Sequence, residues 1–526
     1  MTSSRALARA GLIVSGAFLV SRVLGWLRAV VIVNAFGGAA SIDRLDEFYA
    51  AFRLPDLVFQ LVAAGALATA VVPIVSALFV NDETARTWRV VSTIANLMLV
   101  GLVVLGAIVF VAAPWIIQTI IAPGWDEVRW ARTVDLTRIM ILSPVFLALG
   151  SLATSVLNAR GQFAVSAIAP IVYNLAIIGA AIFLAPSLGV AGLALGVVVG
   201  SLLHVLIQVP AVHRLGYRYD RRIDMADPDA RVALKLMGPR ALGLGAGQIT
   251  FVVVTSLAST LPLDGAVTAF NTAFTLLQIP IGVIGVPLGV VVLPSLAREA
   301  GVGNLDEFAA LMSRAIRLIL FVMLPITGIG IVLRHDIVAA LFGGLTPAAV
   351  DVTAATLLAF LTGLTAHALI AVLARAFYAR MDTKTPVAAA VLAVVLNSTL
   401  AAVLIGPLGL PGLGLAIAIA AWVETVVLVV LLQRSLPELA VRPLVSLAAR
   451  SLIVTLGGSL AAYGVLAGLT LAMGEHPGRF DLLVRMTLVG IVWLLTSAGL
   501  AVLLRIGELR AMIDLMFDLV RRRRPA

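Results

Sequence analysis

The sequence contains no cysteine and only two lysines, Lys235 and Lys384, and charged residues make up 12% of its 526 residues. The lack of cysteine excludes disulfide bonds, thiolate nucleophiles and cysteine-ligated metal sites. A soluble domain carries about twice this fraction of charged residues. Hydrophobic residues make up 61% of the chain, and its mean hydropathy is +1.10. Most of the surface is therefore expected to face lipid or other apolar helices.

The common motifs of catalysis are also missing. Neither lysine lies in a Gly-Lys-Ser/Thr context, so there is no P-loop for ATP. No Gly-x-Ser-x-Gly nucleophile elbow occurs. The histidines do not have the spacing of zinc ligands; they are His204, His213, His335, His367 and His476. We therefore expect neither an enzyme nor a protein with a cofactor or a metal. An ion gradient or the membrane potential would have to drive any transport.

Apolar runs of spanning length recur along the whole chain. A spanning helix needs about 20 apolar residues, and no signal-peptide cleavage site follows the first run. We expect an all-α integral membrane protein with about fourteen transmembrane helices. The predicted spans are 10–35, 47–79, 90–118, 133–158, 164–185, 189–212, 231–257, 266–296, 308–333, 349–378, 385–405, 411–433, 444–472 and 482–507.

Basic residues are distributed unevenly between alternate loops. If the N-terminus is cytoplasmic, the outer loops hold only Arg44, Arg129, Arg132, Arg334 and Arg479, and the inner loops and tails hold more than twice as many. This asymmetry predicts that both termini are cytoplasmic. The formal charge of +10 lies in these short loops and not on one face, so we expect no nucleic-acid partner.

An internal repeat divides the sequence. The segment 190–195 (Val-Ala-Gly-Leu-Ala-Leu) returns at 410–415 (Leu-Pro-Gly-Leu-Gly-Leu), and Ala159-Arg160 returns as Ala379-Arg380. Six spans fit in each copy, which predicts two pseudo-symmetric lobes that rock about a site between them. The predicted parts are an N-lobe at 1–220, a C-lobe at 221–436, two final helices at 437–512 and a basic cytoplasmic tail at 513–526, near anionic headgroups.

Charged residues inside predicted spans are the candidates for function. Arg22 and Arg28 lie in the first span, six residues and about 9 Å apart along the helix axis. One reading is that they line a cavity and bind an anion, because guanidinium groups suit bidentate phosphate recognition. The alternative is structural pairing with Asp46, Asp56 or backbone carbonyls.

Three further residues have two readings each. Arg53 and Asp56 lie three residues apart in the second span, where they serve a gate or simply pair with each other. Glu424 is isolated in the twelfth span and is either a coupling site or a hydrogen-bond donor or acceptor between helices. Asn174, Gln248 and Asn397 are expected to hold helices together.

An ordered set of motifs resembles the MurJ (MviN) family of lipid II flippases, within the MATE-like exporter superfamily. The motifs cover nearly the whole chain in the family's order. They are Ser21 to Gly25 with Arg28, Asp46 to Pro55, Gly65-Ala66 with Val72-Pro73, Ala122 to Gly124, Leu157-Asn158, Met237 to Pro239, Gly285 to Leu288 with Leu293 to Leu296, and Phe377 to Pro386.

The resemblance implies a flippase that moves the undecaprenyl-pyrophosphate-linked peptidoglycan precursor from the inner to the outer leaflet by alternating access. It implies a bacterial inner-membrane location, a lipid-tail groove formed by the last two helices, and contact with membrane lipids and cell-wall synthesis machinery. Carried over by position, Arg22 and Arg28 contact the anionic head and Ser21 lines the same face. Asp46 and Arg53 serve the outer end of the cavity or its gate.

The sequence departs from the family's usual pattern of charges. Phe59 stands where a basic residue is usual, Ala64 lies near a usual acidic position, and Ala29 follows Arg28 where an acidic residue is common. In the eighth span, Phe274, Thr275 and Gln278 replace a charged cluster. A flippase for another lipid-linked saccharide, a MATE-like small-molecule antiporter and a non-transporting scaffold are therefore the alternatives.

Overall fold

The computed structural model describes residues 4–39, 41–62, 66–474 and 478–510, without the side chains of 4–15, 17–18, 66–70, 236 and 238–246. The predicted tail, 513–526, and the basic residues Arg521 to Arg524 lie outside this part. All regular structure in the described residues is helical, which confirms the predicted all-α class. The chain divides into two compact units, residues 1–268 and 269–526.

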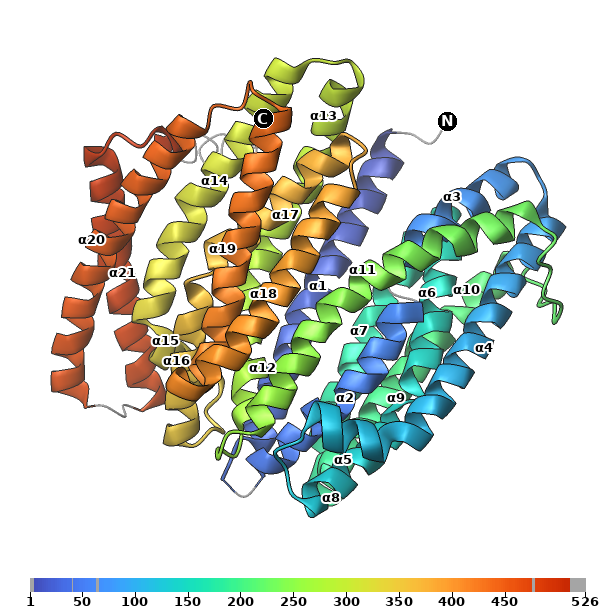
Figure 1. Cartoon of the computed structure of the whole chain (residues 1–526), viewed down its shortest axis with the longest axis horizontal. Helices are drawn as coiled ribbons and strands as arrows, with labels where there is room; N and C mark the ends of the chain where they lie inside the picture. Colours follow the sequence, from blue (N-terminus) through green and yellow to red (C-terminus); the bar gives the residue numbers. More distant parts are fainter. Residues whose placement is uncertain (1–3, 40, 63–65, 475–477, 511–526) are drawn as a thin grey trace. The chain divides into compact units, whose positions relative to one another are not determined.

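Unit 1 is built from helices that pack in pairs (Figure 1). Here α7 packs on α1 and α9, α6 on α9 and α3, and α11 on α2 and α3. The elements are α1 (Ser4–Phe36), α2 (Ile42–Val62), α3 (Ala66–Val80), α4 (Thr84–Ile116), η1 (Ile117–Ile121), α5 (Glu127–Met140), α6 (Ser143–Ala159), α7 (Phe163–Gly179), η2 (Ala180–Leu184), α8 (Ala185–Leu188), α9 (Val190–Leu206), α10 (Val209–Arg214) and α11 (Pro228–Ser259).

Unit 2 follows the same pattern and adds two final helices. Here α18 packs on α19, α17 on α19 and α13, and α20 lies beside α21 (Figure 1). The elements are α12 (Ala266–Pro280), which begins in unit 1, η3 (Ile281–Gly285), α13 (Val286–Gly301), α14 (Leu305–Val332), α15 (Arg334–Leu341), α16 (Pro347–Leu361), α17 (Leu364–Ala379), α18 (Lys384–Leu408), α19 (Leu410–Ser435), α20 (Val441–Met473) and α21 (Arg479–Leu503).

Among the described residues, eleven helices are long and apolar enough to cross a membrane, or up to twelve if the bent pair α16 and α17 is one span. The protein is therefore a multi-pass membrane protein. The two predicted spans outside this set, 47–79 and 231–257, fall on α2 with α3 and on α11. Because α2 carries several charged residues, its mean hydropathy is low. The count of fourteen stays a prediction.

Two of the three π-helical turns in the described residues closely follow a proline. Pro114 lies three residues before η1, and Pro280 comes directly before η3. Both η1 and η3 are single π-helical turns. A proline has no N–H group to donate and its ring crowds the preceding turn.

The predicted repeat recurs in the backbone geometry. Gly189 and Gly409 precede the two copies of the repeated segment and have nearly the same dihedral angles, φ 58° with ψ −144° and φ 60° with ψ −142°. This region of φ and ψ is open essentially to glycine alone. The shared glycine therefore sets the same sharp reversal between two helices in each unit.

A second turn recurs at the same displacement of 220 residues. In unit 1, Gly161 has φ +70°, and the N–H of Gln162 donates to the carbonyl of Leu157 at 2.8 Å. In unit 2, Met381 has φ +61°, and the N–H of Asp382 donates to the carbonyl of Phe377 at 2.9 Å. The repeat read from a few residue matches is thus a repeat of structure.

The division by contacts falls later in the chain than the predicted lobe boundary at residue 220. Because α11 packs on α2, α3 and α4, it groups with unit 1. The repeat, in contrast, begins its second copy before α11. The contact division groups helices that pack together, whereas the repeat compares positions along the sequence. The lobes at 1–220 and 221–436 stay a prediction.

A buried ion pair fastens the last two helices to the rest of unit 2. The side chains of Arg485 on α21 and Asp336 on α15 are 3% and 4% exposed. Arg485 Nε donates to Asp336 Oδ2 at 2.9 Å, and a second bond makes the pair bidentate. Arg485 also donates to the carbonyl of Gly474 at the end of α20. One guanidinium thus joins α15, α20 and α21.

We predict that Arg485→Met lowers the unfolding temperature of the purified protein in detergent. The change leaves the Asp336 carboxylate buried and uncompensated, at a cost of about 3 kcal/mol. The double variant Asp336→Leu/Arg485→Met should recover much of the loss. Arg314→Ala is the control, because Arg314 and Glu307 form an exposed pair and such pairs contribute little. If the thermal unfolding curve of Arg485→Met coincides with that of Arg314→Ala, the prediction is wrong.

Candidate functional site

The first helix is held along α7 by a polar contact inside the apolar seam. The side-chain amide of Asn174 donates to the carbonyl of Ser21 at 3.5 Å and to that of Pro170 at 3.0 Å. In hydrocarbon such bonds join helices because no water competes for them. The expected role of Asn174 in holding helices together is therefore confirmed, and its contact positions the helix that carries Arg22 and Arg28.

Arg28 lies against an aromatic hydroxyl of the same neighbour. Its guanidinium carbon is 5.8 Å from the ring centroid of Tyr173 on α7, and its side chain hydrogen-bonds to the Tyr173 hydroxyl. The Arg28 side chain is partly buried. Its charge is therefore held in a fixed direction by a ring that does not neutralise it.

The second helix presents a charged face with helical spacing. Tyr49, Arg53 and Asp56 lie four and three residues apart, so they share one side of α2. The Tyr49 side chain lies within electrostatic reach of both Arg28 and Arg53. The fold thus brings an arginine from α1 and an arginine from α2 to the same tyrosine.

The same face of α2 is anchored on α11. Arg53 Nε donates to the hydroxyl of Thr255 at 2.9 Å, and the Arg53 guanidinium lies 5.1 Å from the ring centroid of Phe251. Asp56 accepts hydrogen bonds from the side-chain amides of Gln60 and Gln248. Both Arg53 and Asp56 therefore contact α11, in addition to any pairing with each other.

Arg22 differs from Arg28 in its surroundings. Its side chain is exposed, whereas those of Ser21 and Arg28 are partly buried. Six residues on a helix differ by about 120° in azimuth, so the two guanidinium groups leave α1 in different directions. Glu424, the remaining candidate, lies partly buried on α19 in unit 2.

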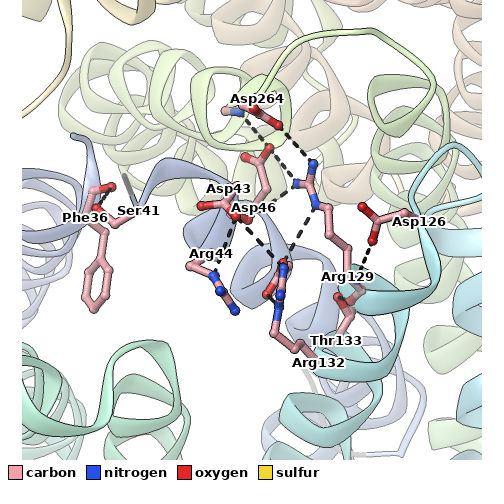
Figure 2. Close-up of polar contacts among 12 residues, drawn as sticks. Phe36, Ser41, Asp43, Arg44, Asp46, Asp126, Arg129, Arg132, Thr133 and Asp264 are labelled. Atoms are coloured by element: carbon pink, nitrogen blue, oxygen red, sulfur yellow. Dashed lines mark hydrogen bonds and ion pairs between the residues drawn. The ribbon is translucent and has the colours of Figure 1, made fainter. Parts of the chain in front are cut away.

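Where α2 begins, six charged residues form a cluster that we call the α2 clamp: Asp43, Asp46, Glu47, Arg129, Arg132 and Asp264 (Figure 2). Asp46 is 1% exposed. It accepts bonds from the N–H of Gly265 at 2.9 Å and from the N–H and hydroxyl of Thr268, each at 2.7 Å. Its carboxylate therefore fastens the start of α2 to the segment that enters α12.

Two arginines of α5 complete the α2 clamp. Arg132 forms a bidentate ion pair with Glu47, which is fully buried. Arg129 lies 3.5 Å from Asp46 and 3.2 Å from Asp264, with its guanidinium 4.1 Å from the ring centroid of Trp125 (Figure 2). Each buried carboxylate is thus compensated by a cation, as burial of charge requires.

The loop before α5 packs against the end of α11 at one glycine. A Cβ on Gly124 would lie 2.3 Å from the carbonyl oxygen of Ser259, which is closer than atoms can approach. The N–H of Gly124 donates to the Ser259 hydroxyl at 3.2 Å. This contact brings the loop that carries the α2 clamp arginines next to α11 and explains the glycine of the Ala122 to Gly124 motif.

The family described as lipid II flippase MurJ matches residues 32–477. A lipid II flippase MurJ of Burkholderia cenocepacia is 32% identical over 438 residues, which cover 80% of this chain and 82% of that protein. The chain belongs to the MurJ family. A probable lipid II flippase MurJ of Vibrio cholerae is 31% identical and covers 81% of this chain and 83% of its own length. The predicted resemblance is therefore confirmed.

Solved structures agree on the fold. A lipid II flippase MurJ in an inward closed conformation has a TM-score of 0.76 at 21% identity, covering 94% of this chain and 99% of its own. An inward-facing multidrug resistance MATE family transporter has a TM-score of 0.64 at 17% identity, covering 80% of this chain and 95% of its own. At these identities the likeness shows a shared fold alone.

Only some of the candidate residues lie within the part of the chain that matches the MurJ family. Asp46, Arg53, Asp56 and Glu424 lie within the matched residues 32–477, whereas Ser21, Arg22 and Arg28 precede them. The role of each stays a prediction. The described residues contain no group of three or more His, Cys, Asp or Glu side chains that could hold a metal ion.

Several residues of this region were not recognised as candidates from the sequence. Tyr49 and Tyr173 carried no signal of their own, because a tyrosine in an apolar helix is unremarkable until a charge is placed beside it. Arg129 and Arg132 were counted only as outer-loop charges. Their three-residue spacing, like the adjacent acids Asp46 and Glu47, was a readable sign of paired partners.

Phe274 and Thr275, two of the residues predicted to replace the family's usual charges, lie on α12 in unit 2. Phe274 on α12 packs edge-on against Phe360 and parallel to Phe270. Thr275 donates its hydroxyl to its own helix at the Asn271 carbonyl. At this predicted departure from the family's charges, α12 therefore carries an aromatic cluster. Ala64 lies outside the described residues.

We predict that Asp46→Ala exposes the segment that enters α12. The change leaves the two N–H groups and one hydroxyl that donate to Asp46 without their acceptor, and each such loss costs about 1–3 kcal/mol. In a chain without cysteine, Ala266→Cys supplies a single buried thiol. Its maleimide labelling should become at least about tenfold faster in the Asp46→Ala background. Asp43→Ala, on the same helix turn but partly exposed, is the control and should label slowly; equal rates would contradict the prediction.

Proposed function

We propose that this protein is a lipid II flippase that moves the undecaprenyl-pyrophosphate-linked peptidoglycan precursor from the inner to the outer leaflet. The observation that carries the proposal is the match to the MurJ family over residues 32–477. The curated relatives with this name span about four fifths of their own length in the comparison. No ATP motif occurs in the chain, so the proposed driving force is an ion gradient or the membrane potential.

The charges of unit 1 support recognition of an anionic head. Arg28 is directed by Tyr173, and Arg53 by Thr255 and Phe251. Both lie within electrostatic reach of Tyr49, so two cations from α1 and α2 lie near one hydroxyl. A pyrophosphate offers several oxygens for charge-assisted hydrogen bonds, and planar guanidinium groups bind such oxygens in pairs. Arg22 and Ser21, one turn or more away on α1, are proposed to extend the same surface.

The α2 clamp supports alternating access. It ties α2, α5 and the entry to α12 through one buried carboxylate, Asp46, and one ion pair, Glu47 with Arg132. Opening this end would break charge-assisted bonds that can re-form when it closes. We propose that the α2 clamp is the outer gate and that the hydrogen bonds to Asp46 hold it closed. Asp56 is proposed to be the charge partner of Arg53. In unit 2, Glu424 is proposed to serve coupling or to join helices.

The last two helices support a binding surface for the lipid tail. Both α20 and α21 expose large apolar side chains, among them Leu456, Leu460, Leu495 and Leu503. Exposed apolar surface of this kind is stable against hydrocarbon. We propose that residues 437–512 hold the lipid tail, that both termini are cytoplasmic in a bacterial inner membrane, and that cell-wall synthesis machinery is the partner.

A flippase for another lipid-linked saccharide is the second candidate. It is favoured by one observation, the aromatic cluster of Phe270, Phe274 and Phe360 where the family carries charge. A head with fewer anionic groups would need fewer cations. The MATE-like fold keeps a small-molecule antiporter as an alternative, and a non-transporting scaffold is the reading with least support, because a scaffold has no need of directed arginines.

We predict that the purified protein in liposomes moves lipid II between leaflets and that Arg28→Ala lowers the rate about tenfold or more, as expected for loss of one charge-assisted contact. The transport rate of Arg28→Lys should lie between those of the unaltered protein and Arg28→Ala, since lysine keeps the charge but not the planar guanidinium. The readout is the fraction of a labelled lipid II accessible to an outside reagent over time. Transport of a different undecaprenyl-linked head at a higher rate would favour the second candidate.

In cells depleted of their own flippase, the chain should restore growth and outer-leaflet precursor, and Arg28→Ala should not. Arg434→Ala, which removes an exposed arginine at the end of α19, is the matched control and should rescue fully. Membrane insertion is checked by blotting. Normal insertion of the unaltered chain without rescue would refute the function, and full rescue by Arg28→Ala would remove that residue from it.

A further inference from the structure

Between α10 and α11 the chain is not helical, and this connection, residues 215–227, lies along the first turns of α4. We call it the α4 strap. Near its start, the ring of Tyr217 packs edge-on against Trp88 of α4, with 5.3 Å between the ring centroids. At its end, Asp227 forms an ion pair with Arg86 of α4 at 2.9 Å. Both ends of the α4 strap are therefore fastened to the same helix.

Polar side chains of α4 also hold the backbone of the α4 strap. The side-chain amide of Asn96 donates to the carbonyls of Asp220 and Arg222 at 2.9 and 3.3 Å. The N–H of Asp220 donates to the hydroxyl of Ser92 at 3.1 Å, and the hydroxyl of Tyr219 donates to the Asn96 side chain at 2.7 Å. A segment outside helices needs such partners for its backbone groups. The contacts fix which side chains of the strap point outward.

The lengths of the adjoining helices place the α4 strap at the surface of the bilayer. It begins directly after Arg214, the last residue of the candidate span 190–214. The candidate span of α4 and η1, Thr84–Ile121, has 38 residues, which correspond to about 57 Å of helix. The hydrocarbon of a bilayer is only about 30 Å thick. The first turns of α4, with the strap on them, therefore extend into the headgroup layer.

The exposed side chains of the α4 strap are basic and apolar. Arg218, Arg221 and Arg222 are exposed. Within the part of the chain that the structure describes, their guanidinium groups form neither a hydrogen bond nor an ion pair. Large apolar or aromatic side chains lie exposed between and after them: Tyr219, Ile223 and Met225, which are 56%, 44% and 45% exposed. This combination is typical of segments that lie in a membrane interface.

The acids of the α4 strap are directed to its own backbone or to α4. Asp220 accepts the N–H of Arg222 at 2.9 Å. Asp224 accepts the N–H groups of Ala226 and Asp227 at 3.0 and 3.3 Å, and Asp227 itself is paired on α4. The arginine side chains are thus the most exposed charges of the strap, and its outer surface is basic.

The internal repeat shows that this basic segment is not required to build a unit. At the displacement of 220 residues, Arg214 at the end of α10 corresponds to Arg434 near the end of α19. The connection that follows in unit 2, residues 436–440, contains one acid, Glu438, and no basic residue. The arginines of the α4 strap are therefore specific to unit 1.

We propose that the α4 strap binds anionic phospholipids. Arg218, Arg221 and Arg222 contact the lipid phosphates, because guanidinium groups form charge-assisted hydrogen bonds with phosphate oxygens. The apolar side chains beside them lie at the boundary with the acyl chains. A basic surface of this kind selects negatively charged lipids from a mixed bilayer. A soluble acidic protein would match the charge alone and would leave the apolar side chains without a partner.

The test uses the natural lack of cysteine. Met225→Cys places one fluorophore on the α4 strap of the purified full chain, in nanodiscs of phosphatidylcholine with phosphatidylglycerol as the minor lipid. In separate samples, the same small fraction of one lipid or the other carries a nitroxide high on its acyl chain. We expect labelled phosphatidylglycerol to quench about fivefold more strongly than labelled phosphatidylcholine, since one arginine near a lipid surface contributes about that factor.

Variants of the three arginines show whether their charge causes the preference. Arg218→Gln/Arg221→Gln/Arg222→Gln should make the two labelled lipids quench equally. Replacement of the same three residues by lysine should retain most of the preference, because lysine keeps the charge. All three positions are exposed, so these changes leave the hydrogen bonds between the α4 strap and α4 in place.

The matched control removes the same charge from exposed positions in unit 2, with Arg298→Gln/Arg434→Gln/Arg442→Gln, and should keep the preference. Equal quenching in the unaltered protein would overturn the proposal, as would an equal loss in the control and the strap variant. Quenching by a water-soluble nitroxide but by neither lipid would also overturn it and would favour a soluble acidic partner. No transport is measured, so the result is independent of the proposed flippase function.

Discussion

In the hydrocarbon of a bilayer no water is available to a polar group, and this constraint selects the contacts that hold the protein together. The backbone meets it by forming helices throughout the described residues. Side chains meet it by pairing across helices. Asn174 donates to backbone carbonyls, Asp46 receives three donors from the entry to α12, and Arg485 forms a bidentate pair with Asp336. Each pairing joins segments that are distant in sequence, so the polar residues determine which apolar helices become neighbours.

The same constraint distinguishes a compensated charge from one available for function. The acids of the α2 clamp and the Asp336 with Arg485 pair are buried and bonded to opposite charges. Arg28, in contrast, contacts the ring and the hydroxyl of Tyr173. Those neighbours orient a guanidinium and leave its charge largely intact, which is the condition for attracting an anion. Unit 1 therefore contains arginines paired with buried carboxylates, Arg129 and Arg132, and an arginine held by an aromatic residue, Arg28.

The internal repeat shows how two similar units acquire different roles. The turns at Gly189 and Gly409 and those at Gly161 and Met381 share their geometry closely, which preserves the helix arrangement. The side chains between them have diverged. Phe79 is a buried aromatic residue under Arg160, whereas the residue at the corresponding position of unit 2 is Ala300. A backbone set by these turns and their hydrogen bonds thus tolerates exchange of the side chains between them.

Hydropathy, spacing and motif order are properties of the chain read locally, and they sufficed to predict the all-α class, most of the spans, the repeat and the family. They also offered Asp46 and Asp56 as alternative partners of the first-span arginines, and Asp56 as a partner of Arg53. Only the tertiary structure decided that Asp46 binds Gly265, Thr268 and Arg129, and that Asp56 binds Gln248. Partners that are some 80 to 220 residues apart come together through helix packing. In so uniform an apolar sequence many packings are compatible with one pattern of spans.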